Sequence, residues 1–378
     1  MKKISVLLLT ILIILSACEK KSPEPGKYVI PNYRVSSYTN LSANEITIAI
    51  NPLNTENIIA GSNLDYYYWS FTGATTWSER SLVSGLYGVW GDPVVIFDNN
   101  AYAYYSHLSN PEGPAWIDRI VVQRSINGGQ TWDDGRGIGY NTPKVQDKEW
   151  LAVDNSDSQY SGNLYLSWTE FDVYGSNDPA DKSRIRFSFS DDLSETWSEP
   201  ITISDTEGDC QDDDNTMEGA VPAVGNNGEI YIAWAGPEGI YFDKSTDGGL
   251  SFGTDMVLAP MPGGWGFDVP EISRCNGMPF TVCDISDSEH SGNIYVLWSD
   301  QRNGLDNTDI FIIKSEDSGN TWTDPLKVNN DNTVSHQFFP NICVDPVTGI
   351  IYIVYYDRST AAGVETDVFM ARSDNGGD

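Results

Sequence analysis

One short sequence pattern recurs along the chain and constrains its fold more than any other feature. Five copies are nearly alike: SFTGATTW at 70–77, SINGGQTW at 125–132, SDDLSETW at 190–197, STDGGLSF at 245–252 and SEDSGNTW at 315–322. A sixth copy begins as SDNGG at 373–377. Recurrence of this kind indicates an array built from one repeated structural unit.

Each position of the pattern suits a tight turn between two strands. Serine and aspartate side chains hydrogen-bond nearby backbone amides, glycine adopts positive φ, and the terminal aromatic packs between sheets. Upstream of the turns lie apolar segments such as NLYLSW at 163–168 and, before that one, EWLAVD at 149–154. Apolar residues at nearly every position are expected where neighbouring sheets cover both faces of a strand. Each unit is therefore predicted to contain four short antiparallel strands.

Six such units fit between residue 45 and Asp378, which predicts an all-β, six-bladed β-propeller. The sixth unit lacks its outermost strand. We expect the segment YRVSSY at 33–38 to complete that blade, because an unpaired edge strand exposes unsatisfied backbone groups. The alternative is a strand that lies beyond Asp378.

The N-terminal residues predict export. Two lysines precede an apolar run from Ile4 to Leu15, and small residues precede Cys18. The run is short for a transmembrane helix, and small residues before a cleavage point are typical of a signal peptide. Residues 1–18 resemble a bacterial lipoprotein signal, which implies a lipid on Cys18 and a membrane anchor in the cell envelope, facing the periplasm or the cell surface. An uncleaved anchor is the alternative. Residues 19–32 are predicted to be a linker, and 33–378 one propeller domain.

Charge excludes one class of partner. The chain has 54 acidic and 22 basic residues, with a net charge of −32. Nucleic acid is therefore not expected as a partner, because phosphate binding depends on lysine and arginine.

Motifs for zinc, nucleotide or serine-hydrolase chemistry do not occur in the sequence, so no cofactor is expected to be required. Calcium could bind the acidic segment DTEGDCQDDDN at 205–215, since it prefers carboxylate oxygens; a solvated loop is the alternative. Export would also permit a local disulfide between Cys275 and Cys283.

The repeated turns resemble the Asp-box (BNR) repeats of the sialidase superfamily, whose members are six-bladed β-propellers. This resemblance covers nearly the whole mature chain. It implies a glycan partner and a glycoside hydrolase, with exo-sialidase activity as the named case. It also fits a noncatalytic propeller that binds glycan or protein, because one fold serves many functions.

The resemblance implies particular site residues. Sialidases hold the sugar carboxylate with three arginines and use an aspartate acid/base and a tyrosine nucleophile assisted by a glutamate. The first arginine belongs to an aromatic-Arg-Ile-Pro motif, whose nearest match is Tyr33-Arg34-Val35-Ser36. That match lacks the proline and falls on an outer strand of the predicted unit. Asp65 lies in the first-blade loop where the acid/base is expected, and no residue is assigned as nucleophile.

Function is expected on the face opposite the repeated turns, because loops on a rigid scaffold carry binding and catalytic residues. Acidic residues recur where the chain enters each innermost strand. The candidate catalytic residues are Asp65, Asp92, Glu149, Glu218 and Glu271, and Asp147, Asp268, His336 and Gln337 occupy similar positions. A ring of carboxyls can raise one pKa and create a general acid beside an ionised partner, as glycoside hydrolysis requires. Calcium binding and simple capping of loop amides are the alternatives.

Two arginines and four tryptophans are further candidates for ligand contact. Arg302 and Arg358 follow aspartates in equivalent loops and could bind substrate, or could form ion pairs within their blades. Aromatic rings stack on sugars, although core packing is the common alternative. The tryptophans concerned are Trp90, Trp116, Trp150 and Trp265. Two similar segments, 154–165 and 284–295, are predicted to be self-bonded turns.

Overall fold

The computed structural model describes residues 31–37, 43–111, 116–360 and 362–378. No helix among these residues could cross a membrane. The predicted signal, its Cys18 and most of the 19–32 linker lie outside the described residues. The chain from Arg34 onward forms one compact unit, and the following paragraphs concern that unit.

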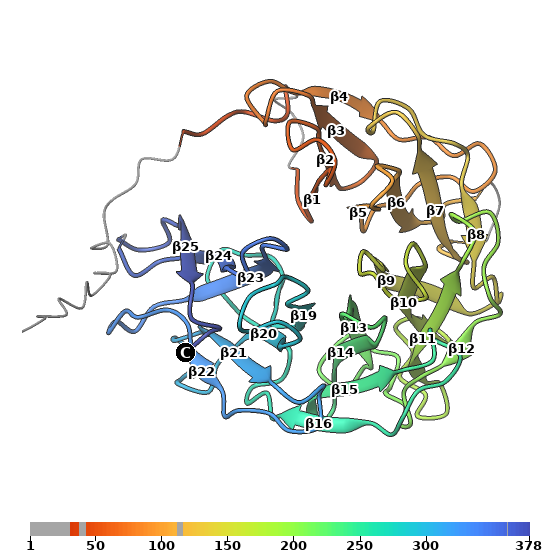
Figure 1. Ribbon diagram of the computed structural model, residues 1–378. Helices are drawn as coiled ribbons and strands as arrows, with labels where there is room; N and C mark the ends of the chain where they lie inside the picture. The colour runs from red at the N-terminus through yellow and green to blue at the C-terminus, as the bar shows by residue number, and fades with distance from the viewer. Residues whose placement is uncertain (1–30, 38–42, 112–115, 361) are drawn as a thin grey trace, which may run out of the picture. The chain divides into compact units, whose positions relative to one another are not determined.

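Six antiparallel sheets succeed one another in chain order (Figure 1). The first blade contains β1 (Thr47–Ile50), β2 (Ile58–Ser62), β3 (Tyr66–Ser70) and β4 (Ser78–Ser81). The second contains β5 (Val94–Phe97), β6 (Ala103–Leu108), β7 (Ile120–Ser125) and β8 (Arg136–Ile138). The third contains β9 (Val145–Val153), β10 (Leu164–Phe171), β11 (Ser183–Ser190) and β12 (Ile201–Thr202).

The remaining blades follow the same order. The fourth contains β13 (Glu218–Val224), β14 (Ile230–Gly236), β15 (Gly239–Ser245) and β16 (Met256–Ala259). The fifth contains β19 (Phe280–Cys283), β20 (Ile294–Asp300), β21 (Asp309–Ser315) and β22 (Leu326–Lys327), and a small hairpin of β17 (Gly266–Phe267) and β18 (Cys275–Asn276) precedes it. The sixth contains β23 (Gln337–Val344), β24 (Ile351–Asp357) and β25 (Asp367–Ser373).

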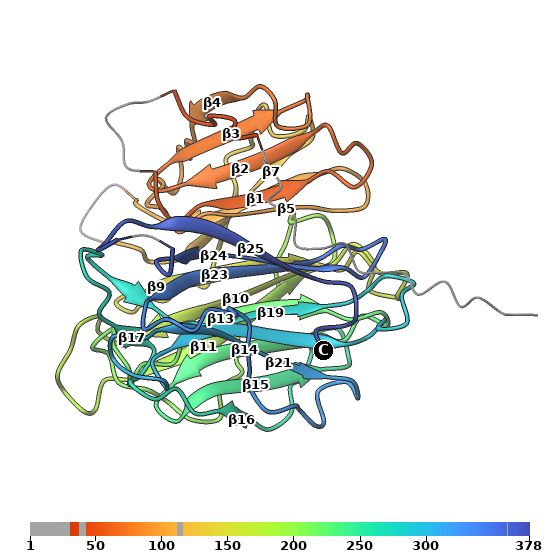
Figure 2. The ribbon, with the colours of Figure 1, turned by 90° about the vertical axis from the view of Figure 1, so that its left-hand side faces the viewer.

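The innermost strand of each blade contacts the innermost strand of the next, from β1 through β5, β9, β13 and β19 to β23. In Figure 1 the blades surround a central axis seen end-on, and Figure 2, turned by 90°, shows strands running along that axis. The predicted all-β, six-bladed propeller is confirmed. Antiparallel pairing places the repeated turns at one end of the axis. The loops that enter the innermost strands lie at the other end, which we call the mouth face.

The predicted closure of the last blade by residues 33–38 is wrong for the residues that the structure describes. The sixth sheet has three strands, and residues 33–37 form no strand. The Ser37 amide instead donates to the Glu79 carboxylate of β4, at 3.1 Å from Oε2. A side-chain acceptor on the first blade thus holds this segment, whereas backbone hydrogen bonds to the sixth blade were expected. Apolar side chains of both blades remain exposed, namely Ile48 and Ile50 of β1, Val354 and Tyr356 of β24, and Val368 and Met370 of β25.

Three tryptophans at equivalent positions form the centre of the core. Trp168 on β10, Trp234 on β14 and Trp298 on β20 are completely buried. The Trp298 indole N–H donates to Asp300 Oδ2 at 2.8 Å, so its polar atom is satisfied inside the core. Neighbouring blades cover both sides of these strands, which explains their uninterrupted apolar sequences.

The repeated turns are held by their own side chains, as predicted. In the fourth blade, Ser245 Oγ accepts from the Gly249 amide at 3.0 Å, and Asp247 Oδ1 accepts from the Ser251 amide at 3.0 Å. Gly249 has φ of 90°, and a Cβ there would lie 2.6 Å from the Phe187 ring. Only glycine meets both conditions, because an L side chain disfavours that φ and no space exists for it.

The aromatic residue that ends each turn is less buried than the sequence suggested. Trp322 packs edge-on against Phe242 at 5.0 Å between ring centroids, but it is only partly buried. The turn aromatic therefore covers the edge of an inter-blade core whose centre is Trp298 and its equivalents.

Two smaller predictions have clear outcomes. The segment 154–165 is a self-bonded turn, since Asp154 Oδ1 accepts from the Ser156 amide at 2.8 Å and Asp154 Oδ2 accepts from Ser158 Oγ at 2.6 Å. The equivalent Asp284 turn has the same bonds. The local disulfide is wrong, because Cys275 and Cys283 are both free thiols.

Candidate functional site

Strained backbone marks the start of the innermost strands on the mouth face. Glu45, Asp92 and Lys148 have left-handed φ values of 49°, 53° and 52°. Glu45 and Asp92 lie two residues before pairing with the second strand begins, at Thr47 and Val94. Lys148 lies at the bulge of β9, two residues before pairing resumes at Trp150. Gly219 and Phe339 share this conformation next to the bulges of the fourth and sixth blades. Such a conformation costs about 1–3 kcal/mol for a residue with a side chain, and strain of this kind concentrates at functional sites.

Lys148 lies among acidic residues from the first four blades. Its ammonium lies 3.8 Å from Asp92 Oδ2. Burial opposes the charge on Lys148, but Asp92, Glu45, Glu218 and Asp147 outweigh burial and raise its pKa. Lys148 therefore stays charged and supplies positive potential to an otherwise acidic mouth. We call Glu45, Asp92, Asp147, Glu149, Asp212 and Glu218, together with Lys148, the acidic cluster.

Asp147 is a partly exposed acid of this cluster. Burial, followed by repulsion from Asp92, raises the pKa of Asp147 from 3.8 to about 8, although Lys148 partly opposes the shift. Asp147 is nevertheless only partly buried. A carboxyl that holds its proton at neutral pH and can be reached from solvent has the properties of a general acid.

Asn63 links the acids of the first two blades. Its Nδ2 donates to Glu45 Oε2, and its Oδ1 accepts from the Asp92 amide at 2.8 Å. Burial of the Glu45 carboxyl, followed by repulsion from Asp92, raises the pKa of Glu45 to about 7. Asn63 thus fixes two neighbouring carboxyl groups from a loop that carries no sequence motif.

Glu149 and Glu218 lie deeper than Asp147. Each is only 2% exposed. Both carboxyl oxygens of Glu149 lack a hydrogen-bond partner among the described residues, and burial raises its pKa well above the ordinary range. Glu218 Oε2 accepts from Thr216 Oγ1 at 3.0 Å, and burial followed by repulsion from Asp212 also raises its pKa. Both side chains are therefore buried and hold their protons at neutral pH.

Asp212 brings a tyrosine and an arginine to the edge of the acidic cluster. It accepts from Arg274 Nη2 at 2.7 Å and from the Tyr174 hydroxyl. Burial, followed by the bond to Asp212, raises the pKa of Tyr174. Tyr174 therefore keeps its proton, which is the opposite of what an activated phenolate nucleophile needs.

The acidic segment 205–215 is solvated in part: Asp205, Glu207 and Asp213 are exposed, while two of its other acids bind the rest of the fold. Asp214 Oδ1 accepts from the Gly266 amide at 2.7 Å, and Asp212 binds Arg274, so two of its acids attach it to the entry of the fifth blade. Over the described parts of the chain, no group of three or more His, Cys, Asp or Glu side chains is arranged to hold a metal ion. Asp212 and Asp214 therefore position this loop, and calcium binding by the segment stays a prediction.

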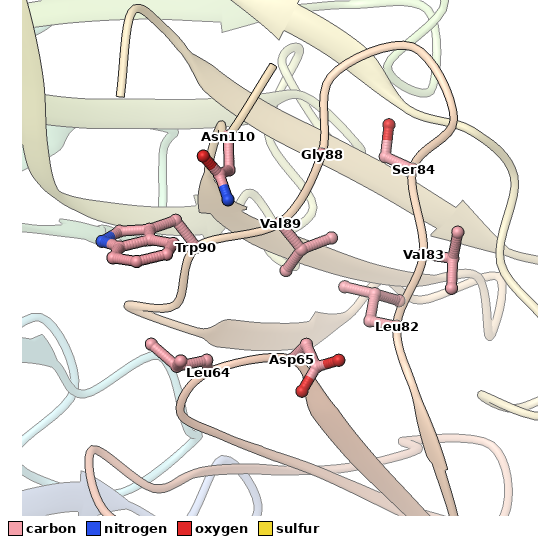
Figure 3. A pocket seen from close by; sticks show the side chains of 9 residues that line it. All are labelled: Leu64, Asp65, Leu82, Val83, Ser84, Gly88, Val89, Trp90 and Asn110. Atoms are coloured by element: carbon pink, nitrogen blue, oxygen red, sulfur yellow. The ribbon is translucent and has the colours of Figure 1, made fainter. Parts of the chain in front are cut away.

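The structure separates the remaining acidic candidates from the cluster. Asp65 lines a pocket between the first two blades, beside Leu64 and Leu82 (Figure 3). Glu271 is an exposed residue of the loop between β17 and β18 and takes no part in the described contacts of the acidic cluster. Of the five predicted catalytic residues, the fold thus gathers Asp92, Glu149 and Glu218.

The predicted substrate arginines are engaged in the scaffold. Arg302 Nε donates to Asp300 Oδ1 at 2.9 Å, and its guanidinium stacks 4.3 Å from the Phe311 ring centroid. Arg358 is buried and donates to the Pro270 carbonyl at 2.9 Å. Arg302 forms the ion pair of the predicted alternative, whereas Arg358 fixes its loop through hydrogen bonds to Thr366 Oγ1 and the Pro270 carbonyl. Ligand contact by either arginine stays a prediction.

Arg34 lies beside the outer edge of the first blade, away from the acidic cluster. Its Nε donates to the Ser36 carbonyl at 2.5 Å, and the adjoining Ser37 binds Glu79 on β4, the outermost strand. The structure therefore places the nearest match to the sialidase arginine motif away from the mouth.

Comparison with known proteins supports the fold. No protein-family model matches the sequence, and no curated protein matches it. A protein of unknown function from Dyadobacter fermentans aligns with a TM-score of 0.56 and 12% identity, over 87% of this chain and 94% of its own. The GH93 alpha-L-arabinofuranosidase of Fusarium graminearum aligns with a TM-score of 0.52 and 14% identity, over 87% and 92%. A leech intramolecular trans-sialidase aligns with a TM-score of 0.53 and 12% identity, over 87% and 67%. This chain therefore has a fold that is also found in an arabinofuranosidase and a trans-sialidase.

Proposed function

We propose that this protein is a glycoside hydrolase that cleaves uncharged glycans at the acidic cluster. One observation carries the proposal: Asp147, a reachable carboxyl with a pKa of about 8, lies in electrostatic contact with Asp92, whose carboxylate is 3.8 Å from the Lys148 ammonium. Glycoside hydrolysis generally needs a protonated carboxyl and an ionised carboxylate on either side of the scissile bond.

The two carboxyl groups have distinct roles in this mechanism. Asp147 donates its proton to the glycosidic oxygen, so that the leaving sugar departs as a neutral alcohol. A water molecule adds to the anomeric carbon in its place, and the proton that this water releases to solvent is recovered by Asp147. The Asp92 carboxylate, 3.8 Å from the Lys148 ammonium, supplies negative charge to the oxocarbenium-like transition state. Burial and repulsion from Asp92 sustain the raised pKa of Asp147.

Sialic acid is a poor fit for this site. A sialidase holds the substrate carboxylate with three arginines, whereas here Arg302 binds Asp300 and Arg34 lies beside the outer strand. The arginine nearest the acidic cluster, Arg274, is already paired with Asp212 at 2.7 Å. An anionic sugar would also be repelled by the surrounding acids, so the site favours an uncharged glycone.

Export and anchoring form part of the proposal. The apolar run from Ile4 to Leu15 and the small residues before Cys18 support a lipid-anchored protein of the bacterial cell envelope. Incorporation of a labelled fatty acid, lost in Cys18→Ser, tests the anchor; equal labelling of both proteins would overturn it.

A sugar-release assay tests the hydrolase. The protein without residues 1–18 is incubated with arabinan, galactan, xylan, mannan and sialyllactose, and free sugar is measured by chromatography. We expect release from at least one neutral glycan and no release of sialic acid. Release of sialic acid would contradict the proposed specificity. Binding to a glycan without release from any substrate would favour a noncatalytic glycan-binding propeller.

A further inference from the structure

Three aromatic side chains form a row on the mouth face beside the acidic cluster. The Trp90 and Trp116 ring centroids lie 6.1 Å apart at 83°, and those of Trp116 and Tyr174 lie 6.1 Å apart at 88°. The rings come from the β4–β5, β6–β7 and β10–β11 loops. Trp90 is 37% exposed and Trp116 is 43% exposed. Two large aromatic side chains are therefore partly exposed to solvent, although each already contacts a neighbouring ring.

One end of this aromatic row reaches the proposed catalytic residues. The Tyr174 hydroxyl donates to Asp212, which belongs to the acidic cluster, and Asp147 is among the charges that influence Tyr174. Tyr174 is fixed from behind by Phe171, at 5.0 Å between ring centroids. This end of the aromatic row is therefore bonded directly to the acidic cluster.

The other end of the row opens into a pocket of about 330 Å³ between the first two blades. Trp90 and Leu64 lie on one side, Ser84 and Val89 belong to the loop that arches from Leu82 to Trp90, and Asn110 comes from the segment after β6 (Figure 3). This volume is at the lower end of the range for ligand pockets, about 300–1,000 Å³, and suits a single sugar unit of a longer chain.

The loop that carries Trp90 is held in one conformation by its own backbone contacts. Gly88 has φ of 68°, and a Cβ at that position would lie 1.9 Å from the Asn110 carbonyl oxygen. The Asn110 amide donates to the Tyr87 carbonyl at 2.8 Å, and the Trp90 amide donates to the Leu108 carbonyl at 3.0 Å. Backbone bonds between the two loops thus hold Trp90 in place without a ligand, which reduces the entropy that binding must remove.

The chemistry of this surface selects an uncharged ligand. Asp65 is the one charged residue that lines the pocket, and its neighbours are apolar or carry neutral polar groups. Aromatic faces suit the C–H faces of sugar rings, and the acids nearby repel anionic polymers. We infer that the aromatic row and the adjoining pocket form an extended binding cleft for a neutral polysaccharide chain, which runs from the acidic cluster over Tyr174, Trp116 and Trp90 into the pocket. This inference rests on the proposed function for the identity of the reactive end.

Kinetics with Trp116→Ala test the cleft. We expect KM for the neutral polymer that releases most sugar to rise at least about tenfold, while hydrolysis of the disaccharide of the same sugar changes less than about threefold. Trp77→Ala is the matched control, because Trp77 lies on the repeated-turn face and is also partly exposed. An unchanged polymer KM in Trp116→Ala, or an equal rise in the control, would overturn the inference.

A binding assay separates this inference from the proposed hydrolysis. The protein without residues 1–18 and its Trp116→Ala and Trp77→Ala variants are run on native gels that contain arabinan, galactan, xylan or mannan. Retardation of the parent and Trp77→Ala, but not of Trp116→Ala, supports the cleft even if no sugar is released, and then only the hydrolase proposal fails. Equal mobility of all three proteins on every polymer, with folding confirmed by thermal melting, would overturn the cleft.

Discussion

Replacement of Asp147 by asparagine is expected to lower kcat on a neutral glycan at least about a hundredfold, the contribution of one general acid. Asparagine keeps the size of the side chain but cannot donate a carboxylic proton to the glycosidic oxygen. Asp147 holds that proton through burial and repulsion from Asp92. Initial rates of sugar release at pH 7 measure the effect.

Asp157→Asn provides the matched control for this substitution. Asp157 is an exposed acid in the turn between β9 and β10, on the face opposite the mouth, so its removal leaves the rate unchanged. KM of Asp147→Asn is expected to stay within about threefold of the parent, because the lost interaction belongs to the transition state. A kcat within tenfold of the parent would contradict the assignment of Asp147 as general acid.

Trp298→Ala is expected to have the largest effect on stability, a loss of about 3–5 kcal/mol in the free energy of unfolding. The indole is completely buried, and its removal leaves a cavity between the fourth and fifth blades. It also removes the donor to Asp300 Oδ2, a buried carboxylate, and one of the rings beneath the Arg302 guanidinium. Urea unfolding, followed by intrinsic fluorescence, measures the shift in midpoint.

Alanine substitution at Trp322 shows whether the loss of stability depends on the burial of a tryptophan or only on its residue type. Trp322 ends a repeated turn and is only partly buried, so Trp322→Ala is expected to cost clearly less than Trp298→Ala. Equal losses for the two variants would contradict the distinction between the core tryptophans and the turn aromatics. A loss below about 1 kcal/mol at Trp298 would contradict its place in the core.

The fold was predictable because its signals are local and repeated. Turn chemistry is encoded within eight residues, as Ser245 and Asp247 show by bonding amides of their own turn. Strands covered on both faces are recognisable by uninterrupted apolar residues, and Trp168, Trp234 and Trp298 recur at one place in that pattern. The same argument failed for the turn aromatics, since recurrence does not reveal the depth of burial.

The candidate site was only partly predictable because it depends on register and on distant segments. The acids that enter the innermost strands were visible, but the bulges in those strands decide which of two adjacent side chains occupies the strained position. Asp92 and Lys148 both have left-handed φ and so occupy equivalent positions in their blades, whereas from the sequence Asp92 was compared with Asp147. Lys148, Asp212 and Asn63 have no motif, and only their position in the folded chain identifies them.

The N-terminal segment shows a second limit of prediction from sequence. An edge strand that lacks a partner is a sound reason to expect that another segment pairs with it. The backbone amides of a short segment can, however, also bind side-chain acceptors elsewhere on the fold. Here the Glu79 carboxylate binds the Ser37 amide and hydroxyl beside the first blade. A side-chain contact of this kind leaves no trace in strand periodicity.

The raised pKa of Asp147 also has a consequence for stability. A carboxyl whose pKa is about 8 in the folded chain and near 3.8 when unfolded binds more protons in the folded state between these values. Its contribution to stability is therefore complete below about pH 4 and is lost as the pH rises through about 8. Activity measurements above pH 8 consequently need a check that the protein is still folded.

The pH dependence of kcat/KM on a neutral glycan tests the central claim most directly. Because catalysis requires the protonated form of Asp147, the account predicts that kcat/KM of the parent protein falls with a midpoint near pH 8, while circular dichroism still reports folded protein. A fall centred near pH 4, or activity that keeps rising above pH 8, would contradict the account, because either result requires that the acid which protonates the leaving group is not Asp147.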